Sequence, residues 1–125
     1  MRNILIVGIG GFLGSVSRYL AGGWVHRILN NSSFPFGTLA VNICGCFLIG
    51  LLGGLSESRQ LFTGESRLFL FIGVLGGFTT FSSFGYETFA LAQDGETLAA
   101  LANVALQVVL GLSAVWLGNV VSRFM

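Results

Sequence analysis

The 125-residue sequence lacks lysine altogether, and only 9% of its residues are charged. Six arginines and five acidic residues give a formal net charge of +1, which provides no basic stripe for a phosphate backbone. Nucleic-acid binding is therefore not expected. In soluble domains about a quarter of the residues are charged. This chain, in contrast, is 54% hydrophobic and has a mean hydropathy of +0.85. Such a composition predicts a membrane protein.

Cysteine is also scarce, since Cys44 and Cys46 are the only two. Two positions along a helix correspond to about 200° of rotation, so the two thiols would point to nearly opposite sides and could not share one metal ion. We expect both to be small buried thiols. Near the N-terminus, Arg2 alone precedes a long glycine-rich apolar run. This pattern does not predict a cleaved leader.

Hydrophobic segments long enough to cross a bilayer, about 20 residues each, fill most of the chain. Short polar loops with turn-forming residues separate them. The predicted fold is a single all-α transmembrane domain over residues 1–125. Its four helices are expected at residues 4–24, 36–55, 68–92 and 97–122.

An even number of spans places both termini and the middle loop on one side of the membrane. Four arginines would lie on that side and two on the other: Arg2, Arg59, Arg67 and Arg123 against Arg18 and Arg27. This excess is a weak preference for cytoplasmic termini. A chain with so little charge bias could insert in both directions.

The glycines fall into a pattern that could be mistaken for a nucleotide site. The apolar run before Gly10 and Gly14 resembles a strand with a dinucleotide-binding loop, but the spacing differs and no acidic residue follows about 20 positions later. We therefore expect no nucleotide. In spanning helices, glycines four apart form ridges for close packing. Three such pairs occur: Gly10 and Gly14, Gly50 and Gly54, Gly73 and Gly77.

Residues 76–85, Gly-Gly-Phe-Thr-Thr-Phe-Ser-Ser-Phe-Gly, place poor helix formers near the middle of the third span. Glycine, threonine and serine can release the backbone from its helical hydrogen bonds. A bilayer core tolerates this only where the freed groups find partners. We predict a helix broken near residues 76–83, with a continuous, hydroxyl-rich helix as the alternative. Broken helices near the midplane commonly bind ions.

The same segment alternates aromatic rings with hydroxyl groups. Ring edges carry partial positive charge, so rings and hydroxyls together suit a small dehydrated anion without a full charge to trap it. Core packing by the phenylalanines is the alternative. Two further polar pairs lie one turn apart, Thr38 with Asn42 and Asn103 with Gln107. Buried amides in spanning helices act either in transport or as contacts between helices.

Two charged residues fall within the predicted spans. Arg18 is costly in hydrocarbon, so it should occupy a water-filled recess, pair with a partner or extend to the interface. Glu87 follows the hydroxyl-rich segment. It could serve as a hydrogen-bond acceptor or stand beside an anion path as a repulsive neighbour.

Three motifs together resemble the bacterial fluoride channels of the Fluc type, also called CrcB proteins, over nearly the whole chain. The first runs from Gly10 to Tyr19 and includes Arg18, and the second runs from Phe34 to Gly50 and includes Asn42. The third and most specific runs from Gly73 to Glu87. It departs from the usual family pattern at Ser83, where a hydroxyl is nevertheless kept.

The resemblance implies an antiparallel homodimer inserted in both orientations, with two fluoride pores at the subunit interface. It implies a structural sodium ion at the dimer centre, held by the backbone carbonyls of Gly76 and Thr79. Asn42 would be a pore amide, and the ring edges of Phe81 and Phe84 would face fluoride. The remaining residues assigned to the pathway are the hydroxyl residues Thr38, Thr80, Ser82 and Ser83, with Asn103 and Gln107.

Many relatives carry a tyrosine and a serine where this chain has Asn103 and Gln107, although both replacements can donate hydrogen bonds. The resemblance places Arg18 and Glu87 in a vestibule or a structural role. The implied function is passive fluoride export through the bacterial inner membrane, without enzymatic activity.

Two other functions have the same four-helix outline. Small multidrug exporters couple export to protons through a glutamate in the first helix, but the first span here contains no acidic residue. A membrane scaffold would use the glycine ridges only to bind partner helices, and it would carry no ion.

Overall fold

The computed structural model describes residues 1–30, 32–59 and 61–125. Within these ranges, four helical segments are long and apolar enough to cross a membrane, which confirms the predicted multi-pass membrane protein. They are α1 (Arg2–Ile28), α2 (Phe36–Arg59), a third span (Gly64–Gln93) and α6 (Thr97–Ser122). The last matches its predicted bounds, whereas the other three extend by up to four residues at either end. Polar and charged residues continue these helices beyond their hydrophobic stretches.

The third span consists of several helical pieces. They are α3 (Gly64–Arg67), the π-helix η1 (Leu68–Leu75), α4 (Gly76–Phe78) and α5 (Phe81–Gln93). Between α4 and α5, Thr79 and Thr80 have extended backbone angles, with ψ of 157° and 112°. The predicted break near residues 76–83 is confirmed. The wide π-helix directly before it was not anticipated.

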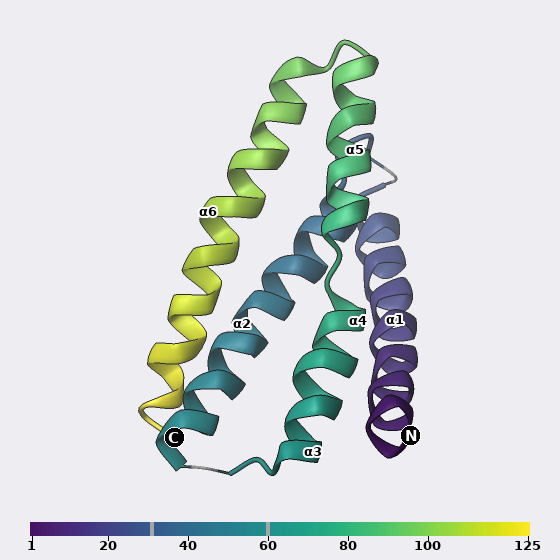
Figure 1. Ribbon diagram of the computed structural model, residues 1–125. Helices are drawn as coiled ribbons and strands as arrows, with labels where there is room; N and C mark the ends of the chain where they lie inside the picture. Colours follow the sequence, from purple (N-terminus) through teal and green to yellow (C-terminus); the bar gives the residue numbers. More distant parts are fainter. Residues whose placement is uncertain (31, 60) are drawn as a thin grey trace.

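The four spans pack as two pairs joined through the third span (Figure 1). α2 packs along α6, α1 packs along η1 and α4, and α5 returns to contact α6. Both termini, the end of α2 and the start of α3 lie at the same end of the molecule. This agrees with the even number of spans.

Glycines allow the helix backbones to approach one another closely. A Cβ atom on Gly10 would come within 2.9 Å of the Gly73 Cα, and one on Gly14 would clash with the Val74 carbonyl oxygen. At the contact between α2 and α6, a Cβ on Gly50 would clash with the Val115 carbonyl oxygen. At these glycines the ridges are contacts between backbones, as the spacing predicted, whereas Gly54 lies against the side chains of Ser122 and Asn119.

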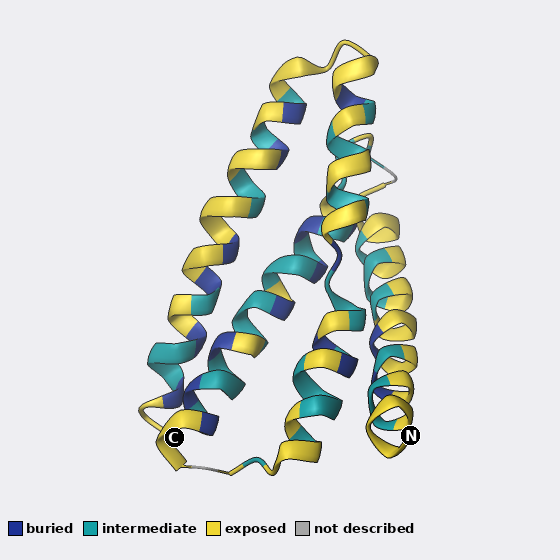
Figure 2. Ribbon diagram, viewed as in Figure 1, coloured by how far each residue is buried: buried dark blue, intermediate teal, exposed yellow. Residues whose placement is uncertain are grey.

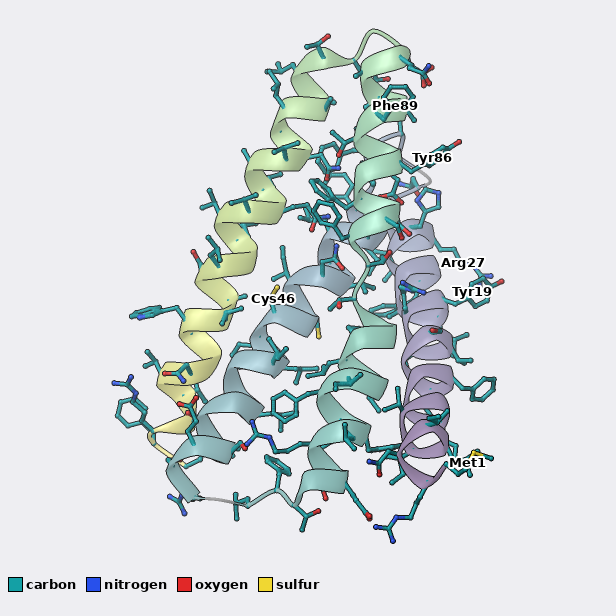
Figure 3. The ribbon with its side chains drawn as sticks, viewed as in Figure 1. Met1, Tyr19, Arg27, Cys46, Tyr86 and Phe89 are labelled. Carbon is teal, nitrogen blue, oxygen red and sulfur yellow. The ribbon has the colours of Figure 1, made fainter. Side chains whose placement is uncertain are left out.

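Much of the outward-facing helix surface is exposed and few residues are buried (Figure 2), and many of the exposed residues are large and apolar. Exposed examples on α1 and α6 are Ile4, Phe12, Trp24, Leu112 and Trp116, each at least 65% exposed. Tyr19, Arg27 and Tyr86 also project outward (Figure 3). This arrangement suits a hydrocarbon solvent.

The two cysteines have different environments. Cys44 is exposed and Cys46 is half-buried, so the expectation of two buried thiols is wrong for Cys44. The reason is the helical geometry, because residues two apart on α2 face nearly opposite sides and only one of them can face the interior.

Candidate functional site

The break between α4 and α5 redirects two backbone amides. In a continuous helix the N–H groups of Thr80 and Ser83 would donate to the carbonyls of Gly76 and Thr79. Instead, the Thr80 N–H donates to Asn42 Oδ1 at 2.8 Å, and the Ser83 N–H donates to Thr80 Oγ1 at 3.2 Å. The carbonyls of Gly76 and Thr79 are thus released from the helical pattern.

Arg18 binds one of these released carbonyls. Its Nη1 donates to the Thr79 carbonyl oxygen at 3.3 Å, across the contact between α1 and the break. Of the three fates considered for this arginine, the structure shows pairing with a partner. The guanidinium therefore helps to satisfy a backbone group that the break exposes.

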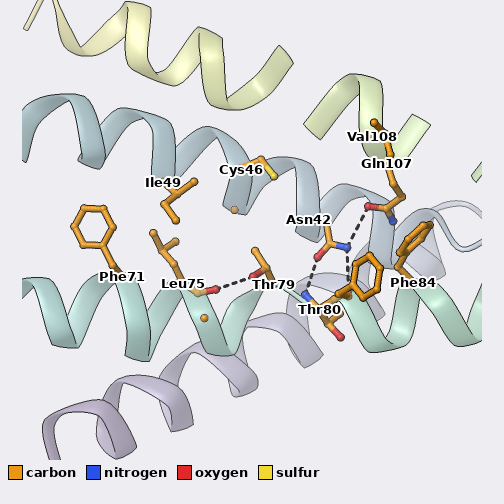
Figure 4. A pocket seen from close by; sticks show the side chains of 13 residues that line it. Asn42, Cys46, Ile49, Phe71, Leu75, Thr79, Thr80, Phe84, Gln107 and Val108 are labelled. Carbon is orange, nitrogen blue, oxygen red and sulfur yellow. Dashed lines mark hydrogen bonds between the residues drawn. The ribbon is translucent and has the colours of Figure 1, made fainter. Parts of the chain in front are cut away.

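The amide of Asn42 makes three hydrogen bonds. Besides accepting from the Thr80 N–H, it donates through Nδ2 to the Thr80 carbonyl oxygen and to Gln107 Oε1, both at 3.1 Å. These bonds join α2, the break and α6 at one point (Figure 4). The sequence predicted a role for each amide separately, but the bond between them was not foreseen.

A cavity of about 370 Å³ lies beside this junction, between α2, the third span and α6. Asn42, Thr80 and Gln107 contribute polar groups to its wall, and Phe81 and Phe84 contribute rings. The two rings meet edge to face, with centroids 5.3 Å apart. The remaining wall is mainly apolar: Ile49, Phe71, Leu75 and Val108, with Cys46. The cavity thus combines aromatic rings with a few hydrogen-bonding groups.

Hydroxyl groups cluster at the start of α5. Thr80 caps this helix, and its Oγ1 lies 3.3 Å from Ser82 Oγ and 3.1 Å from Ser83 Oγ. The structure therefore brings together the three hydroxyls predicted from the third motif. All three belong to the first turn, where backbone N–H groups also favour negative charge.

A second cavity, of about 380 Å³, lies on the α1 side of the break, and Arg18, Thr38, Thr80 and Ser83 help to line it. Thr80 lines both cavities, so the extended segment separates them. Thr38 Oγ1 donates to Glu87 Oε1 at 2.7 Å. This bond shows Glu87 acting as a hydrogen-bond acceptor inside α5.

Asn103 lies apart from the cavities described above. It is fully buried, and its Nδ2 donates to Thr88 Oγ1 at 2.8 Å. Thr88 in turn donates to the Phe84 carbonyl oxygen at 2.8 Å. Asn103 therefore connects α6 to α5, which is the role of a contact between helices that the sequence left open. Thr88 was missed, although it lies one turn after Phe84.

A family comparison accounts for this combination of broken helix, amides and rings. Residues 5–119 match the model of the family described as CrcB-like protein, Camphor Resistance (CrcB). The chain belongs to the CrcB family. Because the match covers the break and every cavity described above, the resemblance noted in the three motifs is confirmed for almost the whole chain.

Curated relatives of this CrcB-family chain carry consistent names. The protein named fluoride-specific ion channel FluC 3 from Methanosarcina barkeri is 46% identical over 98% of this chain and 91% of its own length. FluC of Geotalea daltonii is 47% identical over 99% of both chains. FluC of Geobacter sulfurreducens is 47% identical over 98% of both chains.

The break of this CrcB-family chain also offers a donor set for a hard cation. Backbone carbonyl oxygens are ligands that such cations prefer, and the carbonyls of Gly76 and Thr79 have lost their helical N–H partners. The Thr79 oxygen binds Arg18, but a carbonyl has two lone pairs and can accept once more. These residues fit the sodium ligands that the resemblance implied.

Proposed function

We propose that this CrcB-family protein is a fluoride-specific ion channel, without enzymatic activity, that lets fluoride leave the cell. The observation that carries the proposal is the cavity beside the broken helix, whose wall contains the amides of Asn42 and Gln107 together with the rings of Phe81 and Phe84. The names of relatives that are 46–47% identical support fluoride as the ion.

The cavity can replace part of the water that a small anion loses. Amide and hydroxyl groups donate hydrogen bonds from one side, and the positive edges of Phe81 and Phe84 face the ion from the other. Because none of the described residues that line the first cavity carries a full positive charge, the anion is not held too tightly to leave. The guanidinium of Arg18 lies on the other side of the break, where it binds Thr79.

Export of this kind needs no energy source. A negative-inside membrane potential of 100 mV favours exit of one anion by about 2.3 kcal/mol. Fluoride that entered as neutral HF and dissociated inside would leave down this gradient. The channel would thus protect the cell from fluoride, and a bacterial inner membrane is the location where it would do so.

The proposed assembly is an antiparallel homodimer with two pores at its interface. Two observations support it. Gly76 and Phe81, which flank the break, are exposed in the single chain, and Phe81 is 81% exposed. A second copy related by an axis through the membrane midplane would cover them. The weak arginine bias between the two ends is compatible with insertion in both directions.

The proposed sodium ion lies at the centre of this dimer. The released carbonyls of Gly76 and Thr79 supply two oxygens from each chain. A bound cation would offset the partial negative charge of carbonyls brought together at one point. Its role is structural, because it would hold two breaks against each other.

One observation supports a second candidate, a proton-coupled exporter of the small multidrug type. Glu87 is a carboxyl group within a spanning helix, and its Oε2 is buried without a hydrogen-bond partner among the described residues. Such carboxyls can carry protons. However, α1, where these exporters place their glutamate, contains no acidic residue.

Fluoride efflux from liposomes that contain the purified protein tests the proposal. A potassium ionophore fixes the membrane potential, and chloride is measured in parallel. Rapid fluoride release driven by the potential alone, without chloride release, is the expected result. Release that required a proton gradient would favour the exporter. If neither ion were released, the result would favour a membrane scaffold that binds partner helices and carries no ion.

A further inference from the structure

We propose that the Gln107 side chain supplies the N–H donor that binds fluoride in the first cavity, and that Asn42 is a positioning residue for it. This inference rests on the proposed channel function and assigns different roles to two amides in the same wall. It follows from which group donates and which accepts in the hydrogen bonds that link Thr80, Asn42 and Gln107.

The backbone of Thr80 fixes the orientation of the Asn42 amide. An N–H can only donate and a carbonyl can only accept, so Oδ1 must face the Thr80 N–H and Nδ2 must face the Thr80 carbonyl oxygen. The observed distances are 2.8 Å and 3.1 Å. Exchanging the oxygen and nitrogen of Asn42 would put two donors together and two acceptors together. Only one orientation is therefore compatible with the break.

The orientation of Asn42 then fixes that of Gln107. The second N–H of Nδ2 points to α6, where it is 3.1 Å from Gln107 Oε1. Because an amide nitrogen is the donor here, the glutamine must present its oxygen to Asn42. Its nitrogen is consequently turned away from Asn42. In Figure 4 the Gln107 nitrogen lies on the Phe84 side of the amide.

In this arrangement the N–H donors of Asn42 are hydrogen-bonded, whereas those of Gln107 are not bonded to any described residue. Both N–H groups of Asn42 are used, one by Thr80 and one by Gln107. Gln107 Nε2 is buried and has no hydrogen-bond partner among the described residues, while the residue itself lines the cavity with Phe84. A buried donor without an acceptor is unfavourable. An anion in the cavity would supply that acceptor.

Asn103 Oδ1 is a possible competitor for this donor. It is also buried without a partner, and it lies one turn before Gln107 on α6. Residues four apart share a helix face, so a rotation of the glutamine could pair the two groups. Asn103 Nδ2 donates one of its two N–H groups to Thr88, and Asn103 is not among the residues that line the first cavity. An experiment must therefore distinguish an anion from Asn103 as the partner of Gln107.

Side-chain amide NMR in liposomes makes this distinction directly. The chain has three glutamines, Gln60, Gln93 and Gln107, so protein labelled with ¹⁵N at glutamine side chains gives three amide signals. The signal that is missing from the spectrum of a Gln107→Met variant is assigned to Gln107. Titration with sodium fluoride is expected to shift the Gln107 signal, and equal sodium chloride is expected to leave it in place. Asparagine-labelled protein should show no comparable fluoride shift at Asn42.

Flux measurements provide the second readout. Gln107→Met keeps an unbranched side chain but removes the donor, so fluoride efflux should fall roughly tenfold to a hundredfold. Gln93→Met, at the end of α5 and outside the first cavity, is the matched control and should transport normally.

The outcomes separate the inference from the function on which it rests. A fluoride shift at Asn42 without one at Gln107 would overturn the assignment, as would normal flux in Gln107→Met. An unchanged Gln107 signal in a protein that exports fluoride would also overturn it, and Asn103 would then be the permanent partner. Wild-type liposomes without fluoride flux would instead refute the proposed function itself.

Discussion

The side chain of Asn42 on α2 bonds both backbone polar groups of Thr80, accepting from its N–H and donating to its carbonyl oxygen. A neighbouring β-strand can bond a residue in the same way. Here a single side chain does so at the one extended point of a membrane-spanning helix. The break therefore depends on a residue that lies 38 positions earlier in the chain.

Asn42→Ala should destabilise the protein by about 1–3 kcal/mol, because it leaves the N–H of buried Thr80 without a partner. Thermal unfolding in detergent measures this loss. Asn119→Ala is the control, since Asn119 Oδ1 accepts only an exposed bond from Arg123. Equal losses in the two variants would show that the bond to Thr80 contributes nothing specific. Fluoride rescue of a sensitive strain should also fail with Asn42→Ala.

Gly14→Ala should destabilise the contact between α1 and the third span by about 1–3 kcal/mol. The new methyl group would clash with the Val74 carbonyl oxygen and lie 2.8 Å from the Phe78 nitrogen. Gly8→Ala, on the same helix, meets nothing within 4 Å and should stabilise α1 by roughly 0.5–1 kcal/mol. Unfolding curves of the two variants should move in opposite directions. A shift in the same direction would refute the close contact at Gly14.

Phe81→Ile and Phe84→Ile should each reduce fluoride efflux about threefold to tenfold, the range expected when one aromatic interaction is lost. Both changes remove a ring edge with a modest change in volume. Phe89→Ile, on the exposed side of α5 and outside the first cavity, is the control. Gel filtration checks that each variant keeps its assembly. Normal flux in both cavity variants would eliminate the ring edges from the mechanism.

Replacement of sodium by a large organic cation should weaken the proposed dimer. A ligand present at 100 times its Kd stabilises the state that binds it by about 2.7 kcal/mol, so removal of sodium should shift the monomer–dimer equilibrium correspondingly. Subunit exchange between differently labelled proteoliposomes measures this shift. If exchange is equally slow in both cations, the carbonyls of Gly76 and Thr79 do not hold a structural ion.

The main features of the fold were accessible from the sequence because they depend on local composition. Hydropathy located the four spans, and the helix-breaking residues of 76–85 located the interruption. The π-helix at Leu68–Leu75 was not accessible, because hydrogen bonds from residue i+5 to residue i leave no mark on hydropathy. Helix ends were underestimated where Arg2 and Glu57 continue a helix past its apolar part.

From the sequence, only the residue types of the site could be predicted, and not the contacts between them. The sequence identified Asn42 and Gln107 as polar positions on two helices, but a bond between them depends on the rotation of α2 relative to α6. The contact of Arg18 with Thr79 depends in the same way on how α1 meets the break. Hydrogen-bond direction, which distinguishes the two amides, appears only when the backbone partners are known.

The glycine contacts affect which residues of this molecule can be replaced without moving its helices. A glycine has no side-chain rotamers to lose, so a contact between backbones is formed without the ordering cost that long side chains incur. The distance between α1 and the third span is thus set by atoms common to all amino acids, at Gly10, Gly14 and Gly73. A replacement in the cavity wall, such as glutamine at position 107, can alter which groups face the ion while the helices keep their spacing.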